Sequence, residues 1–369
     1  MSELRRVFSV YGMCLVTDVL SKEECCTMEA LWQQDLLQLV DSGRAHSPQV
    51  EEQLEALRAR GSRDWPLDWS ERRMLGSKGS ASQRGLPHGS FAWASRLHPA
   101  VRRIFAALHE VPEHELVVGL DCTFFSCSDA PAKDSDREWL HVDQNHCTGL
   151  TWQNAQGVLY VWPSEGEHSS TTVVWPCSHR EAYDTLMGDV LAHDRGRSLG
   201  GQSVRLNQLI DERTRTTMLA QAVAGARRVP CPAGTLLLWD SRTVHQGWGG
   251  GPRLAQPVCW EPRLRRDAAA LRRKAWMCAA GVPSSHSGSE GRVHGMATRS
   301  RPEPSPWSEE VPIASASIVP FGVAPGREAE WEAMQDELWM GSGDPRKIAG
   351  RIDDQRVRAL LRPEVLAVL

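Results

Sequence analysis

The sequence lacks the patterns that mark several classes of protein. None of its 10 cysteines forms a Cys-x-x-Cys pair or another zinc-ribbon spacing, which excludes that kind of structural zinc site. No apolar stretch approaches the roughly 18 residues that cross a bilayer, and the N-terminus has no apolar run typical of a signal peptide. The last residues, LAVL, are not a peroxisomal address. We therefore expect a cytoplasmic protein with reduced thiols.

Lysine is also scarce, and arginine carries most of the positive charge. The lysines are Lys22, Lys78, Lys133, Lys274 and Lys347. The formal net charge is −4, which argues against the whole molecule being a nucleic-acid binder. With 369 residues, 41% of them hydrophobic, the chain can bury a large core in one large domain or two ordinary ones. The 15 tryptophans suit both cores and pocket walls, and we expect most of them in the core.

Hydrophobic periodicity divides the chain into three regions. Residues 1–115 are expected to hold a strand within 7–19 and three helices, the first of them opened by a capping box at Ser21–Glu24. Residues 116–261 contain short apolar or alternating runs separated by turn residues, which are typical of an all-β barrel or sandwich. Residues 262–369 are predicted to be a helical extension.

Two further segments are predicted inside these regions. One is a helical insertion at about 203–224, which interrupts the β region. The other is a mobile stretch at about 281–308, which is rich in Ser, Gly and Pro.

A candidate metal site lies in the β region. In the stretch EWLHVDQNHCTG, His141 and Asp143 are two residues apart, so on a strand their side chains share one face. A second histidine, His245, follows the apolar run TLLLWD about a hundred residues later. Two imidazoles and one carboxylate form the facial triad of non-heme Fe(II) oxygenases, which leaves positions open for a co-substrate and O₂. The inward-facing residues of a barrel could bring the three together.

Arg253 adds a second element to this site. It begins the strand that follows His245, and its guanidinium could form a bidentate pair with the far carboxylate of a 2-oxo acid. An isolated arginine beside a glycine-rich turn is usually a solvated surface residue. The order of all four residues favours the functional interpretation.

These motifs resemble the phytanoyl-CoA dioxygenase-like Fe(II)/2-oxoglutarate oxygenases over residues 7–261. The resembling text is HVD, QGVLYVWPSEGEHSSTTVVWPCSHREAY, PAGTLLLWDSRTVHQG and PRLAQPVCWEP. The resemblance implies a mainly β fold with packed helices, in which a double-stranded β-helix (a cupin-like jelly roll) carries N-terminal and C-terminal helical additions. It departs from the family pattern at Cys177, where the family has Gly, and at Leu159, where several members have Trp.

The resemblance also implies an activity and its residues. Iron would be held by His141, Asp143 and His245, and 2-oxoglutarate by Arg253. The enzyme would use O₂, with ascorbate as a candidate reductant, to hydroxylate or otherwise oxidise an unactivated C–H bond of a small organic substrate, releasing succinate and CO₂. Related halogenases replace the carboxylate ligand with a small residue, so Asp143 favours oxidation over halogenation.

Residues that share parity with the ligands are candidates for the substrate pocket. They are Asn145, Gln153 and Trp239. For each, ordinary packing is the competing interpretation. His179 in the Pro176–His179 turn is expected to stabilise the turn, and His146 to be a structural, hydrogen-bonded histidine.

Three other functions compete with an oxygenase. The same ligands with a water molecule would suit a zinc hydrolase or lyase, although such an enzyme has no evident need for Arg253. A catalytically silent binding module would keep the fold without turnover. A nucleic-acid-directed oxygenase would use a basic run, which we interpret instead as a solvated helix face paired with local acids. That run comprises Arg263, Arg265, Arg266, Arg272, Arg273 and Lys274.

Overall fold

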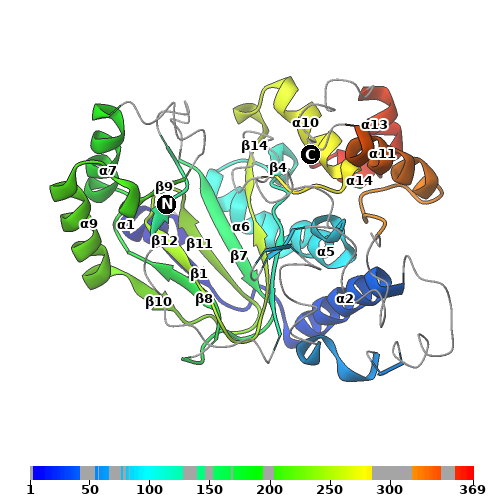
Figure 1. Cartoon of the computed structure of the whole chain (residues 1–369), viewed down its shortest axis with the longest axis horizontal. Coiled ribbons are helices and arrows are strands. Elements are labelled where there is room, and N and C mark those ends of the chain that lie inside the picture. Colours follow the sequence, from blue (N-terminus) through cyan, green and yellow to red (C-terminus); the bar gives the residue numbers. More distant parts are fainter. Residues whose placement is uncertain are drawn as a thin grey trace.

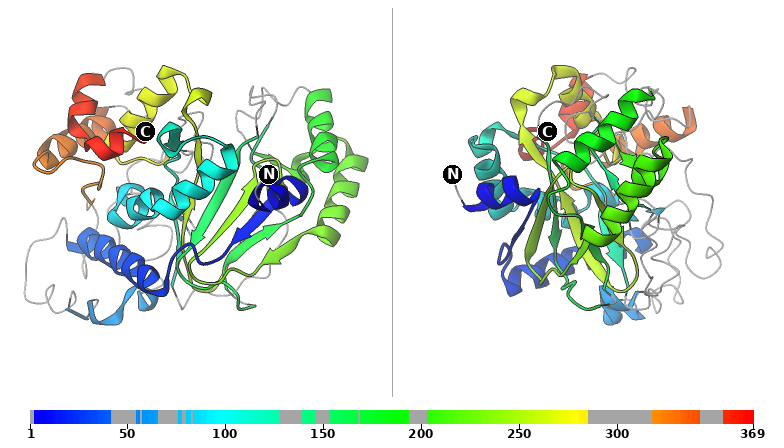
Figure 2. Two further views of the ribbon diagram at one scale, coloured as in Figure 1. Left: turned by 180° about the vertical axis from the view of Figure 1, so that it is seen from behind. Right: turned by 90° about the vertical axis from the view of Figure 1, so that its left-hand side faces the viewer.

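The fold is described from a computed structural model of the chain (Figure 1). The structure describes residues 3–41, 55–56, 58–65, 76–77, 80–82, 84–127, 139–145, 153–167, 169–193, 203–284, 318–341 and 354–369. Two antiparallel sheets form its centre, and helices cover their outer faces (Figures 1 and 2).

The larger sheet has seven strands in the order β1-β11-β7-β13-β5-β3-β2. In the order of the chain they are β1 (Met13–Val16), β2 (Gly76–Ser77), β3 (Ser80–Ala81), β5 (Thr123–Ser126), β7 (Ala155–Tyr160), β11 (Thr235–Asp240) and β13 (Arg253–Val258).

The smaller sheet has five strands in the order β10-β8-β12-β6-β9. They are β6 (His141–Val142), β8 (Thr171–Val174), β9 (Val204–Arg205), β10 (Arg227–Val229) and β12 (His245–Trp248). A separate ribbon pairs β4 (Leu116–Val118) with β14 (Trp260–Pro262).

The chain passes back and forth between the two main sheets. From β5 to β13, strands of the larger sheet alternate with β6, with β8 and β10, and with β12 of the smaller one. This alternation is the double-stranded β-helix, a jelly roll. The predicted fold class, mainly β with packed helices, is therefore confirmed.

Strand periodicity separates an inner from an outer face of each sheet. On β7, Val158 and Tyr160 belong to an apolar cluster that also contains Val174 of the smaller sheet. Leu159, between them, belongs instead to the cluster formed with the helices. Because neighbouring residues of a strand point to opposite faces, odd and even positions have different surroundings. This parity decides which side chains can reach the site.

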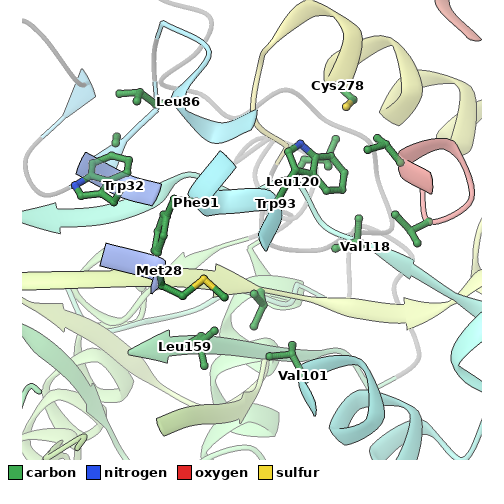
Figure 3. Packing of buried hydrophobic residues seen from close by; sticks show 14 of the residues in the cluster. Met28, Trp32, Leu86, Phe91, Trp93, Val101, Val118, Leu120, Leu159 and Cys278 are labelled. Atoms are coloured by element: carbon green, nitrogen blue, oxygen red, sulfur yellow. The ribbon is translucent and has the colours of Figure 1, made fainter. Parts of the chain in front are cut away.

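Helices cover the outer face of the larger sheet. They are α2 (Lys22–Asp41), α5 (Ser90–Leu97) and α6 (Pro99–His109). Trp32 of α2 is buried, and its ring centroid lies 5.6 Å from that of Phe91 on α5 and 5.2 Å from that of Phe125 on β5. Figure 3 shows Trp32 beside Phe91 in this core, and the contact with Phe125 packs α2 against the sheet. Aromatic pairs at such distances stabilise a fold beyond the area that they bury.

A second helical layer covers the smaller sheet. It consists of α7 (Glu181–Ala192) and α9 (Glu212–Gly225), which pack against Val142 and Val173. The predicted insertion at about 203–224 therefore contains a helix, α9, preceded by β9 and a short 3-10 turn.

The N-terminal prediction was partly wrong. Residues Glu3–Tyr11 form helix α1, and only Met13–Val16 form a strand. The spacing of the apolar residues Val7, Phe8 and Tyr11 also fits a helix. Alternation in such a short segment does not distinguish the two structures. The first helix after the capping box is confirmed as α2, where Glu24 accepts a hydrogen bond from the Ser21 amide (2.7 Å).

The C-terminal region joins the same apolar core. Its helices are α10 (Ala268–Ala280), α11 (Glu328–Gly341), α13 (Asp354–Leu360) and α14 (Pro363–Leu366). The Val118 amide donates to the Val368 carbonyl (2.8 Å), and the largest apolar cluster draws residues from all three predicted regions. Residues 285–317, which contain most of the predicted mobile stretch, and His146 lie outside the described residues.

The basic run is not a uniform solvated face. Arg266 pairs with the buried carboxylate of Glu261 (2.5 Å), and Lys274 is buried and donates to the Val118 carbonyl. Arg272 and Arg273 are exposed. The interpretation as a solvated face is therefore wrong for Arg266 and Lys274, since burial removes them from contact with a phosphate. Across the described ranges, no helix is both long and apolar enough to cross a membrane.

Candidate metal centre

His141, Asp143 and His245 meet on the inner face of the smaller sheet. His141 on β6 is the register partner of His245 on β12, and Asp143 follows β6 directly. One Asp143 oxygen lies 3.3 Å from His141 Nε2, and the other lies 3.1 Å from His245 Nε2. One ligand atom from each residue falls within 4.8 Å of the others, and all three residues are buried. The structure thus brings together the three residues predicted from the sequence.

Backbone carbonyls fix the orientation of both imidazoles. His141 Nδ1 donates to the Trp139 carbonyl (2.7 Å), and His245 Nδ1 donates to the Thr243 carbonyl (2.9 Å). With Nδ1 as the donor, Nε2 of each ring faces Asp143 and is the atom that can bind a metal ion. A hydrogen bond from the other ring nitrogen is the usual support of a metal-binding histidine.

The arrangement suits a cation. Burial, and then the neighbouring His141, lowers the pKa of His245, which favours the neutral ring that binds a metal. Two imidazole nitrogens and a carboxylate lie close enough together to bind one ion. Two nitrogens and a carboxylate are ligands that both iron and zinc accept.

Hydrogen bonds also position the backbone that carries the ligands. The Ser241 carbonyl accepts from the amides of Asp143 (2.9 Å) and Gln144 (3.1 Å). Ser178, in the predicted Pro176–His179 turn, accepts from the Val244 amide (2.8 Å), directly before His245. The turn therefore supports the backbone at His245, one of the three candidate metal-binding residues. Cys177, where the resembling family has Gly, adopts a left-handed conformation with φ of 66°.

The N-terminus supports both the turn before His245 and the Pro176–His179 turn. The Gly12 carbonyl accepts from the Asp240 amide (2.9 Å) and from Thr243 Oγ1 (2.8 Å). His179 donates from Nε2 to the Ser9 carbonyl (3.1 Å), which agrees with the structural role expected for it. A Cβ on Gly12 would lie 2.3 Å from His179 Nδ1, so the approach requires glycine.

Two indoles flank the triad. The Trp239 ring centroid lies 5.1 Å from that of His245, and the Trp139 ring centroid lies 4.6 Å from that of His141. Trp239 is buried, and within the described ranges its Nε1–H has no hydrogen-bond partner. A buried donor without a partner is costly, so this N–H is available to a bound molecule.

Arg253 is buried inside the barrel. Its guanidinium donates to the Tyr160 hydroxyl (3.0 Å) and lies over the rings of Phe124 (4.4 Å) and Tyr160 (5.2 Å). The Tyr160 hydroxyl lies in turn 3.0 Å from that of Thr172. No acid of the described residues is among the contacts of Arg253. A buried guanidinium without an acid is a site for an anion.

Tyr160 was missed in the sequence. Leu159 is the residue found where several members of the resembling family have Trp, but it points outward into the helical cluster. Tyr160, one residue later, faces Arg253. The parity of β7 could have shown this, since Val158 and Tyr160 share one face.

The remaining predicted pocket residues lie in different surroundings. Asn145 is buried at the end of the segment that carries Asp143. Gln153 is exposed, and its amide donates to Asp240 (2.8 Å), which also pairs with Arg242. This contact ties Gln153 to the partly buried Asp240–Arg242 ion pair.

Comparisons with known proteins give distant similarities. No family model matches the chain. Ava biosynthesis cluster protein O from Aspergillus versicolor is 23% identical over 216 residues, which span 57% of this chain and 66% of that protein. The chain thus matches somewhat less than two thirds of the length of this relative.

Similar solved structures include the apo form of the non-heme monooxygenase ThoJ and the DUF1479 protein GIG2 from Candida albicans. ThoJ has a TM-score of 0.40 and 14% identity, with coverage of 71% of this chain and 80% of ThoJ. GIG2 has a TM-score of 0.41 and 11% identity, with coverage of 94% of this chain and 84% of GIG2. The epimerase SnoN, solved with Fe3+, alpha ketoglutarate and nogalamycin RO, has a TM-score of 0.40, 14% identity, and coverage of 70% and 82%. Scores of this size do not establish a common reaction.

Proposed function

We propose that this protein is an Fe(II)- and 2-oxoglutarate-dependent oxygenase that oxidises a small organic molecule. One observation carries the proposal. The same barrel buries three side chains that can bind one metal ion, His141, Asp143 and His245, and an arginine, Arg253, whose contacts among the described residues include no acid. A metal ion chelated by a 2-oxo dicarboxylic acid supplies both charges at once.

The residues of the chain have separate tasks in this proposal. A ferrous ion with bound 2-oxoglutarate supplies O₂ activation coupled to decarboxylation, with succinate and CO₂ as products. His141, Asp143 and His245 would hold the ion. Related halogenases have a small residue in place of the carboxylate ligand, so Asp143 favours hydroxylation or a related oxidation. Ascorbate is the candidate reductant.

Arg253, Tyr160 and Thr172 would hold the far carboxylate of the co-substrate. The Arg253 guanidinium would form a charge-assisted hydrogen-bonded pair with this carboxylate. The Tyr160 hydroxyl, which contacts the guanidinium, would donate a further hydrogen bond to the carboxylate. Desolvation raises the pKa of Tyr160, so its hydroxyl keeps the proton that it would donate.

The substrate would lie beside the triad, near Asn145 and Trp239. The unpartnered indole N–H of Trp239 suits a carbonyl, ether or hydroxyl oxygen of the substrate. Gln153 is left out of this pocket because its amide is bound to Asp240. The name of the Aspergillus relative connects that protein with a biosynthesis cluster, which supports a small-molecule substrate. Membership of the phytanoyl-CoA dioxygenase-like group and a cytoplasmic location remain predictions.

Succinate release tests the proposal. Wild-type protein and Asp143→Ala are incubated with Fe(II), 2-oxoglutarate and a panel of metabolites. We expect turnover in the wild type, with or without coupling to a substrate, and near-background release in the variant. Anaerobic addition of 2-oxoglutarate to the Fe(II) protein should also give a visible charge-transfer band. A protein that binds zinc, gives no band and hydrolyses a substrate would be a zinc hydrolase instead.

A further inference from the structure

The Trp139 side chain combines stacking with exposure. Its indole is tilted by 31° against the His141 ring at 4.6 Å, yet the residue is 45% exposed. Trp139 also supplies the carbonyl that orients His141 (2.7 Å). Large apolar side chains of the described residues are mostly buried, and an aromatic surface beside a candidate reaction centre is often covered by a bound molecule.

Strand register places Trp139 opposite a glycine. His141 pairs with His245 in antiparallel strands, so two residues further along the strands Trp139 lies across from Gly247. On its other side Gly247 pairs with Thr172, whose hydroxyl contacts Tyr160 and through it Arg253. Gly247 therefore lies between Trp139 and the residues around Arg253.

The inner face is open at Gly247. Among the described residues, only Trp139 Cζ3, at 3.6 Å, would come within 4 Å of a Cβ built there. Gly247 is exposed although it shares the inner face with the buried His245. Space is thus left at Gly247, on the side of the triad where Thr172 lies.

We propose that Trp139 and Gly247 determine which 2-oxo acid the site accepts. The methylene carbons of a 2-oxo dicarboxylic acid would run over Gly247 and along the Trp139 indole, with the keto end at the triad and the far carboxylate at Arg253. Covering the indole removes apolar surface from water, which favours a chain that fills the space. This inference rests on the proposed function.

A titration with acids of different length tests the inference. Fe(II) protein is titrated anaerobically with oxaloacetate, 2-oxoglutarate and 2-oxoadipate, which differ by one methylene each, and the charge-transfer band gives each dissociation constant. The variants are Trp139→Phe, Trp139→Ala and Gly247→Ala. Gly188→Ala serves as the matched control, because a Cβ at Gly188, within α7, has no neighbour within 4 Å.

We expect the wild type to prefer 2-oxoglutarate. Trp139→Ala should weaken 2-oxoglutarate binding by about tenfold and reduce the discrimination against 2-oxoadipate, while Trp139→Phe keeps most of both. Gly247→Ala should weaken the binding of 2-oxoadipate about ten times more than the binding of oxaloacetate, since the added methyl group fills part of the space beside Trp139. Gly188→Ala should match the wild type. Fe(II) affinity, measured without acid, shows whether any loss comes from His141.

Two results would overturn the inference. One is that Trp139→Ala and Gly247→Ala both give the charge-transfer band and bind the three acids with the same relative affinities as the wild type. The other is an equal loss for all three acids in both variants, which would indicate a general disturbance of the site. A wild-type protein that binds Fe(II) but gives no band with any acid would contradict the proposed function itself.

Discussion

The molecule buries two polar clusters, and they balance charge in opposite ways. In the first, the imidazoles of His141 and His245 lie 3.3 Å and 3.1 Å from the Asp143 carboxylate, and the three side chains can bind one metal ion. In the second, between β14 and α10, the Glu261 carboxylate pairs with Arg266 (2.5 Å), and Lys274 donates to a backbone carbonyl. The carboxylate of the second cluster thus has its counter-charge in the chain itself, whereas the counter-charge that we propose for the first is a metal ion.

The difference shows which observation indicates function. Glu261 and Lys274 are buried more deeply than the triad, and burial together with the Arg266 guanidinium holds the pKa of Lys274 well below its ordinary value. A perturbed pKa in a buried group is thus not sufficient evidence of a reactive site. Two features separate the triad from the Glu261 cluster: three side chains that can bind one metal ion, and a buried arginine, Arg253, whose contacts among the described residues include no acid.

The largest expected effect is on the second cluster. Glu261→Gln keeps the side-chain volume but leaves Arg266 buried without its acid, so the free energy of unfolding should fall by about 3–5 kcal/mol. Urea unfolding followed by circular dichroism measures it. Glu330→Gln, which breaks an exposed pair with Arg327, is the control and should leave the stability nearly unchanged. Equal losses in both variants would show that the Glu261 pair is not special.

The triad should respond in the opposite way. Asp143→Asn removes the only formal negative charge of the three, so Fe(II) affinity should drop by at least about a hundredfold. The metal-free protein should keep its stability within about 1 kcal/mol, because asparagine keeps the shape and the hydrogen-bonding capacity of the side chain. Competition with a ferrous chelator and urea unfolding give the two values. A large loss of stability without metal would mean that Asp143 is a structural residue.

Arg253→Lys should have a smaller effect. Lysine keeps the charge but cannot offer the planar fork, so 2-oxoglutarate should bind the Fe(II) protein about tenfold more weakly. Arg228→Lys, whose guanidinium lies over Trp248, is the matched control and should leave the affinity unchanged. The anaerobic charge-transfer titration gives both constants. Wild-type affinity in Arg253→Lys would place the far carboxylate elsewhere.

The smallest effect is expected at Lys274 and appears as a dependence on pH. A lysine whose folded pKa is lowered binds fewer protons when folded than when unfolded, so stability should rise with pH between the lowered value and the ordinary 10.5. Lys274→Met should flatten this rise and change stability near pH 7 by about 1 kcal/mol or less. Thermal unfolding from pH 7 to 10 measures it. The exposed Lys22→Met is the control, and an equally steep rise in Lys274→Met would refute the assignment.

The sequence was informative where spacing alone determines the outcome. The separation of His141 and Asp143 fixes a shared face on any strand, and the position of His245 after an apolar strand indicated a barrel. Arg253 followed from its place at the start of the next strand. These are local properties, and the structure brings all four residues into the barrel.

Features that depend on tertiary contacts could not be predicted in this way. The exposed Trp139 beside Gly247 follows from the register of β6 and β12, which the sequence does not reveal. The burial of Arg266 and Lys274 depends on Glu261 lying under α10. Helix α1 was taken for a strand because a short alternating segment fits both periods.

The contact between Gly12 and the turn before His245 has a consequence for the use of this protein. Because β1 pairs along β11, a shortened chain that starts after Val16 would leave β11 as an open edge, ready to pair with another molecule. It would also free the backbone groups that Gly12 now binds. Such a truncated preparation should aggregate and bind metal poorly even though every proposed ligand is present.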